Sequence, residues 1–113
     1  MFTEFIRWRD LWRCKKCGKQ YVEGQPSQAM GVSHFWPRGK ESVRYDPLNA
    51  DLLCNYPCHQ FFESHRTEYI AWKKDRIGEK AYKLLEVRAH TTQKRDDKLQ
   101  EIVISQLMKS LRE

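Results

Sequence analysis

The sequence predicts a small α+β domain, with one helix before a β-hairpin and several helices after it. Its length of 113 residues suits one domain with a modest hydrophobic core. Four cysteines form two close pairs, and two short β-prone runs lie between the pairs. After the second pair, apolar residues recur with the period of a helix as far as the end of the chain.

The first element is a helix, predicted over residues 3–12 with Thr3 as its cap. Its apolar side chains follow one helix face, at Phe5, Ile6, Trp8, Leu11 and Trp12. Residues 18–31 are predicted to form a loop, because they are rich in Gly, Gln, Pro and Ser.

A β-hairpin with a long connection is predicted next. Its first strand covers residues 32–36 and stops at Pro37, and its second strand covers residues 50–54. Residues 37–51 contain two prolines, a glycine and three cationic side chains, which predicts a long ordered loop leading into the second strand.

The remaining chain is predicted to be helical over residues 59–74, 79–90 and about 95–112. Gly78 breaks the first of these helices from the second.

Polar residues at 91–97 form the predicted linker to the last helix. We therefore divide the chain into a domain at 1–90 and a C-terminal helix at 91–113. That helix carries an apolar set made of Leu99, Ile102, Val103, Leu107 and Leu111. This set either completes the core of the domain or faces a second copy in a homodimer.

The chain is basic and polar. Lys and Arg number 21 against 15 Asp and Glu, which gives a net charge of +6, and the mean hydropathy is −0.84. No apolar run approaches the ~20 residues that cross a bilayer, and the N-terminus lacks the apolar stretch of a signal peptide. We therefore expect a cytoplasmic protein with a polyanionic partner, most commonly nucleic acid.

The two cysteine pairs predict a structural zinc site. The ligands are Cys14 and Cys17, followed by Cys54 and Cys58. Each short spacing lets two thiolates converge on one tetrahedral ion. Two disulfides, a redox pair or four unrelated thiols are the alternatives, but the chain shows neither an export signal nor the βαβ pattern of a redox domain.

Three polar residues stand out within this frame. His34 falls on the first predicted strand, Asn49 precedes the second strand, and His59 opens the helix after Cys58. Taken singly, each is an ordinary polar or turn residue. A hairpin laid against a helix brings the strand and the start of the helix to one side, where a cation can be held.

These residues resemble the HNH endonucleases, which have the ββα-metal fold. The closer resemblance is to the phage NinG-like (Rap-type) recombination endonucleases. It is carried by SHFWPRG at 33–39, VRYDPLN at 43–49 and LCNYPCH at 53–59, with EYIAW and RIGEK further on. The likeness covers residues 12–90. It implies a ββα-metal core, a bacterial host cell as the location, and a gene carried by a phage or prophage.

The resemblance also implies roles for the three residues. His34 corresponds to the general base that takes a proton from water, and His59 to a ligand of a catalytic Mg²⁺ or Mn²⁺. Asn49 corresponds to the residue that braces the loop and orients the base. The implied reaction hydrolyses a DNA phosphodiester, leaving a 5′-phosphate and a 3′-hydroxyl, and branched or Holliday-junction DNA is the expected substrate.

One departure concerns the second ligand of the catalytic ion. Many family members have Asp just before the base histidine, where this chain has Ser33, and serine is a weak ligand for a hard cation. Ser33 is therefore expected to assist His59, water and DNA phosphates. Asp46, Asp51 and His65 are the other candidates.

The loop between His34 and Asn49 is basic. Arg38, Lys40 and Arg44 are the predicted DNA-phosphate contacts, and Lys15, Lys16 and Lys19 are expected to extend the same face. The alternative is a solvated charged loop. At the level of function, the alternatives are a less selective nicking nuclease, a non-catalytic zinc-finger module that binds nucleic acid, and a zinc-stabilised protein-interaction domain.

Overall fold

A computed structural model describes residues 1–37, 39–90 and 97–112. These residues form an α+β fold with a two-stranded sheet, as the sequence predicts, and five α-helices where four were predicted. The strands are β1 (Met30–His34) and β2 (Ala50–Cys54). The helices are α1 (Phe2–Arg9), α2 (Gln60–Ser64), α3 (Arg66–Ile77), α4 (Glu79–Ala89) and α5 (Asp97–Arg112).

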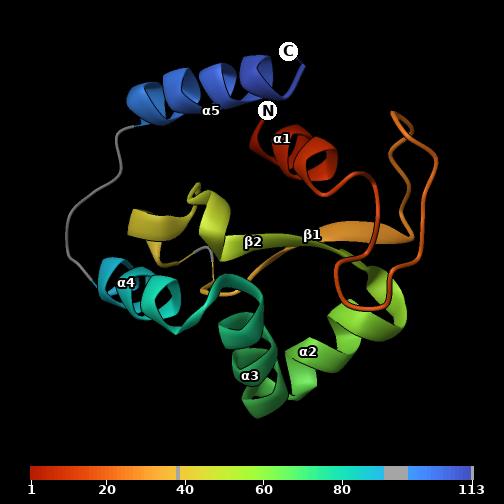
Figure 1. Ribbon diagram of the computed structural model, residues 1–113, viewed down its shortest axis with the longest axis vertical. Coiled ribbons are helices and arrows are strands. Elements are labelled where there is room, and N and C mark those ends of the chain that lie inside the picture. Colours follow the sequence, from red (N-terminus) through yellow and green to blue (C-terminus); the bar gives the residue numbers. More distant parts are fainter. Residues whose placement is uncertain (38, 91–96, 113) are drawn as a thin grey trace.

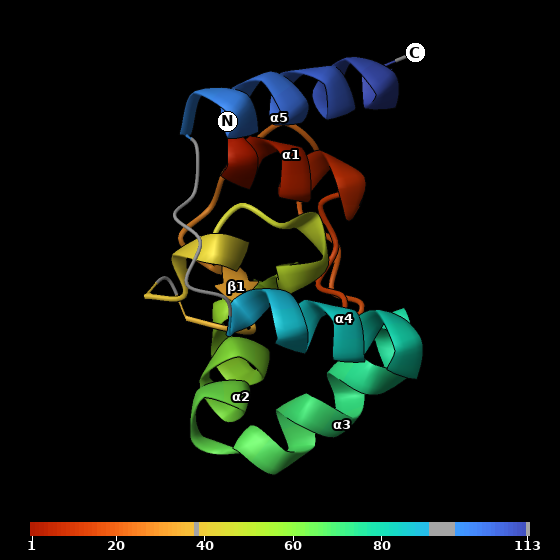
Figure 2. The ribbon, with the colours of Figure 1, turned by 90° about the vertical axis from the view of Figure 1, so that its left-hand side faces the viewer.

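The elements form layers around the sheet. Helices α1 and α5 lie on one side of the hairpin, and α2, α3 and α4 lie on the other (Figures 1 and 2). One apolar core lies between α1, α5 and the sheet, with Phe5, Ile6 and Leu52 among its members. A second core, which includes Phe35 and Phe62, lies towards α3. None of the described helices has the length and apolar character needed to cross a membrane.

The register of the hairpin decides which side chains share a face. The strands are antiparallel, with His34 opposite Ala50 and Met30 opposite Cys54. Side chains alternate between the two faces of a strand. Met30 is buried in the core beneath α1, and the ring of His34 lies 6.0 Å from that of Phe2. The even-numbered residues of β1 therefore face α1, and the odd-numbered ones face α2 and α3.

The second strand has the predicted bounds, but the first begins and ends two residues before the prediction. Met30 is 3% exposed and belongs to the core, so the apolar side chain extends the strand into the predicted loop. At the other end, the backbone N–H of Trp36 donates to the side chain of Asn49. This contact with a side chain takes the place of further backbone pairing between the two strands, so β1 ends at His34.

The first predicted helix is too long. Helix α1 ends at Arg9, and Leu11 and Trp12 have φ angles of 58° and 57°, which turn the chain back. Thr3 does not cap it, because the helix begins at Phe2 after Met1, with no side-chain cap bond.

The helix predicted over 59–74 is broken at His65. The hydroxyl of Ser64 lies within hydrogen-bonding distance of the carbonyl oxygens of Gln60 and Phe61, and His65 Nδ1 lies 2.9 Å from Phe61 O. Side chains that bond the preceding turn in this way compete with the helical backbone bonds. The prediction therefore merged α2 and α3, while the break at Gly78 is confirmed.

Helix α5 packs on α1 through Ile104 and Met108, neither of which was predicted to be a core residue. Of the predicted apolar set, Leu107 packs against this core, while Ile102, Val103 and Leu111 are exposed. The linker at 91–96 and the side chain of Leu99 lie outside the described residues. The homodimer stays a prediction.

Helix α1 covers the free edge of β2. Asp10 Oδ2 accepts a bond of 2.9 Å from the N–H of Leu52, and Arg9 Nη2 donates to Ala50 O at 2.7 Å. The N–H of Lys15 donates to Leu52 O at 2.9 Å. An uncovered edge strand leaves such groups unpaired and invites association with other chains. Here the segment after α1 takes the place of a third strand.

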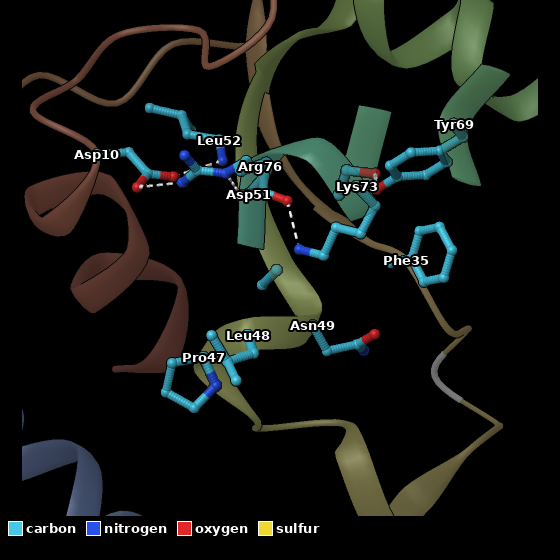
Figure 3. A network of polar contacts seen from close by, with 12 residues as sticks. Asp10, Phe35, Pro47, Leu48, Asn49, Asp51, Leu52, Tyr69, Lys73 and Arg76 are labelled. Carbon is cyan, nitrogen blue, oxygen red and sulfur yellow. Dashed lines mark hydrogen bonds and ion pairs between the residues drawn. The ribbon is translucent and has the colours of Figure 1, made fainter. Parts of the chain in front are cut away.

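A buried charge network ties this edge to α3 (Figure 3). Lys73 is 0% exposed, and its Nζ lies 2.7 Å from Asp51 Oδ2. Arg76 donates through Nε to Asp51 Oδ1, and its Nη2 lies 3.4 Å from Asp10 Oδ1. Burial lowers the pKa of Lys73, and the Asp51 carboxylate opposes that effect. Two carboxylates thus connect α1, β2 and α3.

We expect Asp51→Ala to lower the free energy of unfolding by about 3–5 kcal/mol, because it leaves the buried ammonium of Lys73 without its counter-ion. Urea unfolding of the zinc-loaded protein, followed by circular dichroism, measures the loss. The control is Glu79→Gln, an exposed site on α4 where we expect a change within about 0.5 kcal/mol. Equal effects of the two substitutions would contradict a structural role for the network.

Candidate functional site

The four cysteines come together as predicted. The sulfur atoms of Cys14, Cys17, Cys54 and Cys58 all lie within 4.8 Å of one another. The sulfurs of Cys17 and Cys54, which belong to different pairs, are 3.7 Å apart. Three of the four residues are buried. This convergence is the arrangement that a tetrahedral metal ion such as zinc requires.

Local backbone structure positions each pair. In the first pair, the N–H of Cys17 points to the sulfur of Cys14 at 3.5 Å. Gly18 follows with a φ of +82°, a conformation that glycine adopts without a steric cost. In the second pair, Cys54 ends β2 and Cys58 lies in an irregular turn, η3 (Asn55–His59), so both sulfurs face the first pair.

The thiols of this cluster favour a bound cation. Burial alone would raise the pKa of Cys14, but surrounding N–H groups, first that of Cys17, lower it to about 7. Burial and the neighbouring thiols raise the pKa of Cys58. Adjacent thiols resist ionising together because their charges repel, and a divalent cation removes that obstacle. The donor set therefore fits the predicted zinc.

Asn49 is buried with 0% exposure and connects the two ends of the long loop. Its Oδ1 accepts a bond of 2.8 Å from the N–H of Trp36, and its Nδ2 donates to Trp36 O at 3.0 Å. Nδ2 also lies 3.2 Å from the carbonyl oxygen of Val43. One side chain thus fixes the loop where it leaves β1 and again near its middle.

His34 ends β1 on the face covered by α1, and the N–H of the next residue, Phe35, donates to Asn49 O at 2.8 Å. A basic side chain is connected to the same face through edge-to-face ring contacts. The ring of Tyr45 lies 5.6 Å from that of Phe2, and the guanidinium of Arg44 lies 5.5 Å above Tyr45. The histidine thus shares its side of the sheet with a cation from the long loop.

His59 lies on the opposite face. Its Nδ1 is 3.4 Å from Asn55 Oδ1, and its Nε2 is 3.4 Å from Glu63 Oε1. A Cβ added at Gly31 would lie 2.9 Å from Asn55 Oδ1, so the glycine lets this group approach β1. The structure therefore places His34 and Asn49 close together along the backbone of the hairpin, and it puts His34 and His59 on opposite faces of the sheet.

The ligands predicted for Mg²⁺ or Mn²⁺ do not form a set. Ser33 is buried and its hydroxyl is bonded to that of Tyr69 at 2.7 Å. Asp51 is paired in the charge network, Asp46 with Arg88, and His65 is stacked on a phenylalanine ring. Within the described residues, the four cysteines are the one group of three or more such donors close enough to share an ion.

The predicted DNA contacts are spread over the hairpin loop and the first cysteine pair. Arg38 lies outside the described residues, and Lys40 is half-buried at the start of η1 (Glu41–Val43). Near the metal centre, Lys16 Nζ lies 5.0 Å from the ring of Phe61. Lys19 Nζ lies 5.4 Å from the ring of Tyr21.

Several residues of these sites escaped the sequence reasoning. Asn55 and Glu63 lie four residues either side of His59, a helical spacing that could have revealed the contact. Lys73 gave no such signal, because its partner Asp51 is distant in sequence and only the packing of α3 brings them together.

Comparison with known proteins adds no relative: no family model, no curated protein and no solved structure matches this chain. The fold and the site define a small α+β domain with four cysteines placed to hold one metal ion.

We expect the purified protein to contain zinc, and removal of the ion by a chelator to unfold it. Binding of a structural zinc contributes on the order of 10 kcal/mol to folding, about the whole stability of a small domain. Metal analysis together with thermal unfolding measures both effects. Cys58→Ser should lose zinc, and Lys83→Gln, an exposed change on α4, should retain it.

Zinc affinity should fall as the pH is lowered, because protons compete for the thiolates. An unchanged melting temperature after complete zinc removal would contradict this role.

Asn49→Ala should lower the free energy of unfolding by roughly 2–4 kcal/mol, since it leaves the backbone groups of Trp36 and Val43 without partners in a buried site. Asn55→Ala is the matched control, because Asn55 is exposed, and we expect it to cost less than about 1 kcal/mol. Denaturant unfolding at constant zinc compares the two. A larger loss at Asn55 would contradict the bracing role of Asn49.

Proposed function

We propose that this protein is a DNA endonuclease of the HNH type, acting on branched DNA with His34 as its general base. The observation that carries the proposal is the bracing of the long loop by Asn49 beside His34. Support also comes from the order of the three motif residues between the two halves of the metal centre, and from the net charge of +6.

The proposed reaction begins at His34. A neutral imidazole, with an unperturbed pKa of about 6.5, takes a proton from a water molecule at cellular pH. The water attacks the phosphorus, and the 3′-oxygen leaves, giving a 5′-phosphate and a 3′-hydroxyl. Arg44 lies on the same face and offers a guanidinium to the charged phosphate. Asn49 holds the loop so that Arg44 and His34 keep their relative positions.

Mg²⁺ or Mn²⁺ is the proposed catalytic ion, and its chemistry would be to stabilise negative charge on the phosphate. His59, the ligand that the resemblance implies, has its Nε2 3.4 Å from Glu63 Oε1 on the α2 side. These two side chains lie on the face opposite His34, so an ion bound to them would not contact a phosphate placed at His34. An ion acting on that phosphate would have water and phosphate oxygens as its ligands.

A zinc-stabilised module that binds nucleic acid without cutting it is the second candidate. Two observations favour it: the hydroxyl of Ser33 is engaged by Tyr69, and His34 and His59 face opposite sides of the sheet. A binding module needs the metal centre and the basic surface, but it does not need a base and an ion at one phosphate.

His34→Ala should reduce cleavage by at least about 100-fold while leaving DNA affinity within about twofold, because general-base catalysis contributes on the order of 10²–10⁴. End-labelled four-way junction and linear duplex with the same arms are incubated with the zinc-loaded protein, with and without Mg²⁺ or Mn²⁺. His90→Ala is the matched control, since His90 packs against Trp36 away from the proposed base.

Metal-dependent cuts confined to the junction would support a resolvase, and equal cutting of both substrates would retain the nuclease without junction specificity. Binding by a folded, zinc-loaded protein that cuts neither substrate would overturn the enzyme and favour the binding module.

A further inference from the structure

The charge network opens onto a pocket that has no part in the proposed reaction. The pocket has a volume of about 310 Å³. Its lining consists of Arg9, Pro47, Leu48, Asp51, Lys73, Arg76 and Ile77. It lies along the free edge of β2, between the ends of α1 and α3 and the short turn η2 (Pro47–Asn49). Figure 3 shows Asp51 between Lys73 and Arg76 at this edge.

The charges around the pocket do not balance. Arg9, Lys73 and Arg76 share two carboxylates, those of Asp10 and Asp51, so each cation has an acidic partner but the five groups together carry a net charge of +1. The nearby carboxylate of Asp46 is already paired with Arg88 at 2.8 Å. The end of α3 and the start of α4 meet at Gly78, where their opposite helix-end charges largely cancel. An unmatched charge in a partly buried site attracts an anion.

Donor groups remain available to that anion. Arg76 uses Nε for Asp51 and Nη2 for Asp10, and among the described residues its Nη1 has no acceptor. Each side-chain nitrogen of Arg9 already donates, to Asp10 or to the carbonyl oxygens of Pro47 and Ala50, so Arg9 contributes mainly charge. The side chains of Arg9 and Arg76 are 23% and 25% exposed, so a small molecule can reach them. Lys73 is fully buried behind them and contributes charge rather than direct contact.

The lining and size of the pocket indicate which class of ligand it can bind. A guanidinium fork matches the oxygens of a phosphate or carboxylate group. Pro47, Leu48 and Ile77 add an apolar wall, and the volume is near the lower limit of about 300 Å³ for pockets that hold small molecules. We propose that this pocket binds a phosphate group, either free or carried by a nucleotide, through Arg76, with Arg9 and Lys73 adding positive charge. The proposal does not rest on the nuclease, because these residues take no part in that reaction.

Burial lowers the pKa of Lys73, and the guanidinium groups of Arg76 and Arg9 add to this effect. The negative charge of a phosphate in the pocket would favour the charged form of Lys73. Phosphate binding should therefore stabilise the folded protein.

The test uses the full, zinc-loaded chain labelled with ¹⁵N. Sodium phosphate is titrated against sodium chloride at matched ionic strength while the side-chain Nε–H signals of the arginines are followed. A second arm uses thymidine 5′-monophosphate. We expect saturable shifts at Arg9 and Arg76, unchanged signals at the exposed Arg13, and a higher melting temperature than in chloride. A stronger response to one arm identifies the source of the phosphate group.

Arg76→Gln should weaken phosphate binding roughly tenfold, since it removes a charge-assisted donor. Lys83→Gln makes the same change of charge on α4, outside the pocket, and should leave the affinity unchanged. The spectra of the unsubstituted protein decide the outcome even if Arg76→Gln does not fold. Shifts equal to those in chloride, or shifts spread evenly over all arginines, would overturn the proposal.

Discussion

The ion pairs of Asp10 and Asp51 are the interactions on which the rest of this fold depends. A two-stranded sheet is marginal by itself, because half of the backbone groups of each strand face outward. Here Asp10 accepts a hydrogen bond from the outward-facing N–H of Leu52, and Asp51 forms ion pairs with Lys73 and Arg76 of α3. The same two carboxylates therefore close the sheet edge and anchor helices on both sides of it. Apart from these ion pairs, the polar contacts of α1 include bonds from Arg9 to the carbonyl oxygens of Pro47 and Ala50. Those of α3 include Tyr69 with Ser33 and Arg66 with the carbonyl oxygen of Phe35.

The metal centre performs the corresponding task at the end of β2. Cys54 is the last residue of that strand, and its sulfur meets that of Cys17 from the segment after α1. That segment also bonds the strand directly, through the N–H of Lys15. A chain of this size has a small core, and metal binding adds folding free energy that the core does not supply. The network thus holds one strand at its middle, and a metal bound by the four cysteines would hold it at its end.

The parts of this structure that could be predicted are those set by local spacing. The cysteine pairs, the strand at 50–54 and the break at Gly78 each follow from residues close together in the sequence. One error, the missed break at His65, has a local cause, because Ser64 and His65 bond the preceding turn without changing the apolar periodicity. Other features were missed because a distant contact decides the outcome. Met30 joins β1 because the core beneath α1 takes its side chain, and the pairing of Lys73 with Asp51 exists only after α3 has packed.

The alternation of side chains along β1 limits which residues of this hairpin can act on the same phosphate. Ser33 and His34 are neighbours, so they face opposite sides, and His59 lies beside Gly31, roughly 10 Å along the strand from His34. A phosphate placed at His34 lies on the α1 side, where contacts between His34, Phe2 and Tyr45 lead to the guanidinium of Arg44. Stabilisation of charge at that phosphate must come from the long loop rather than from His59. The bracing of that loop by Asn49 is therefore the feature on which catalysis at this hairpin would depend most.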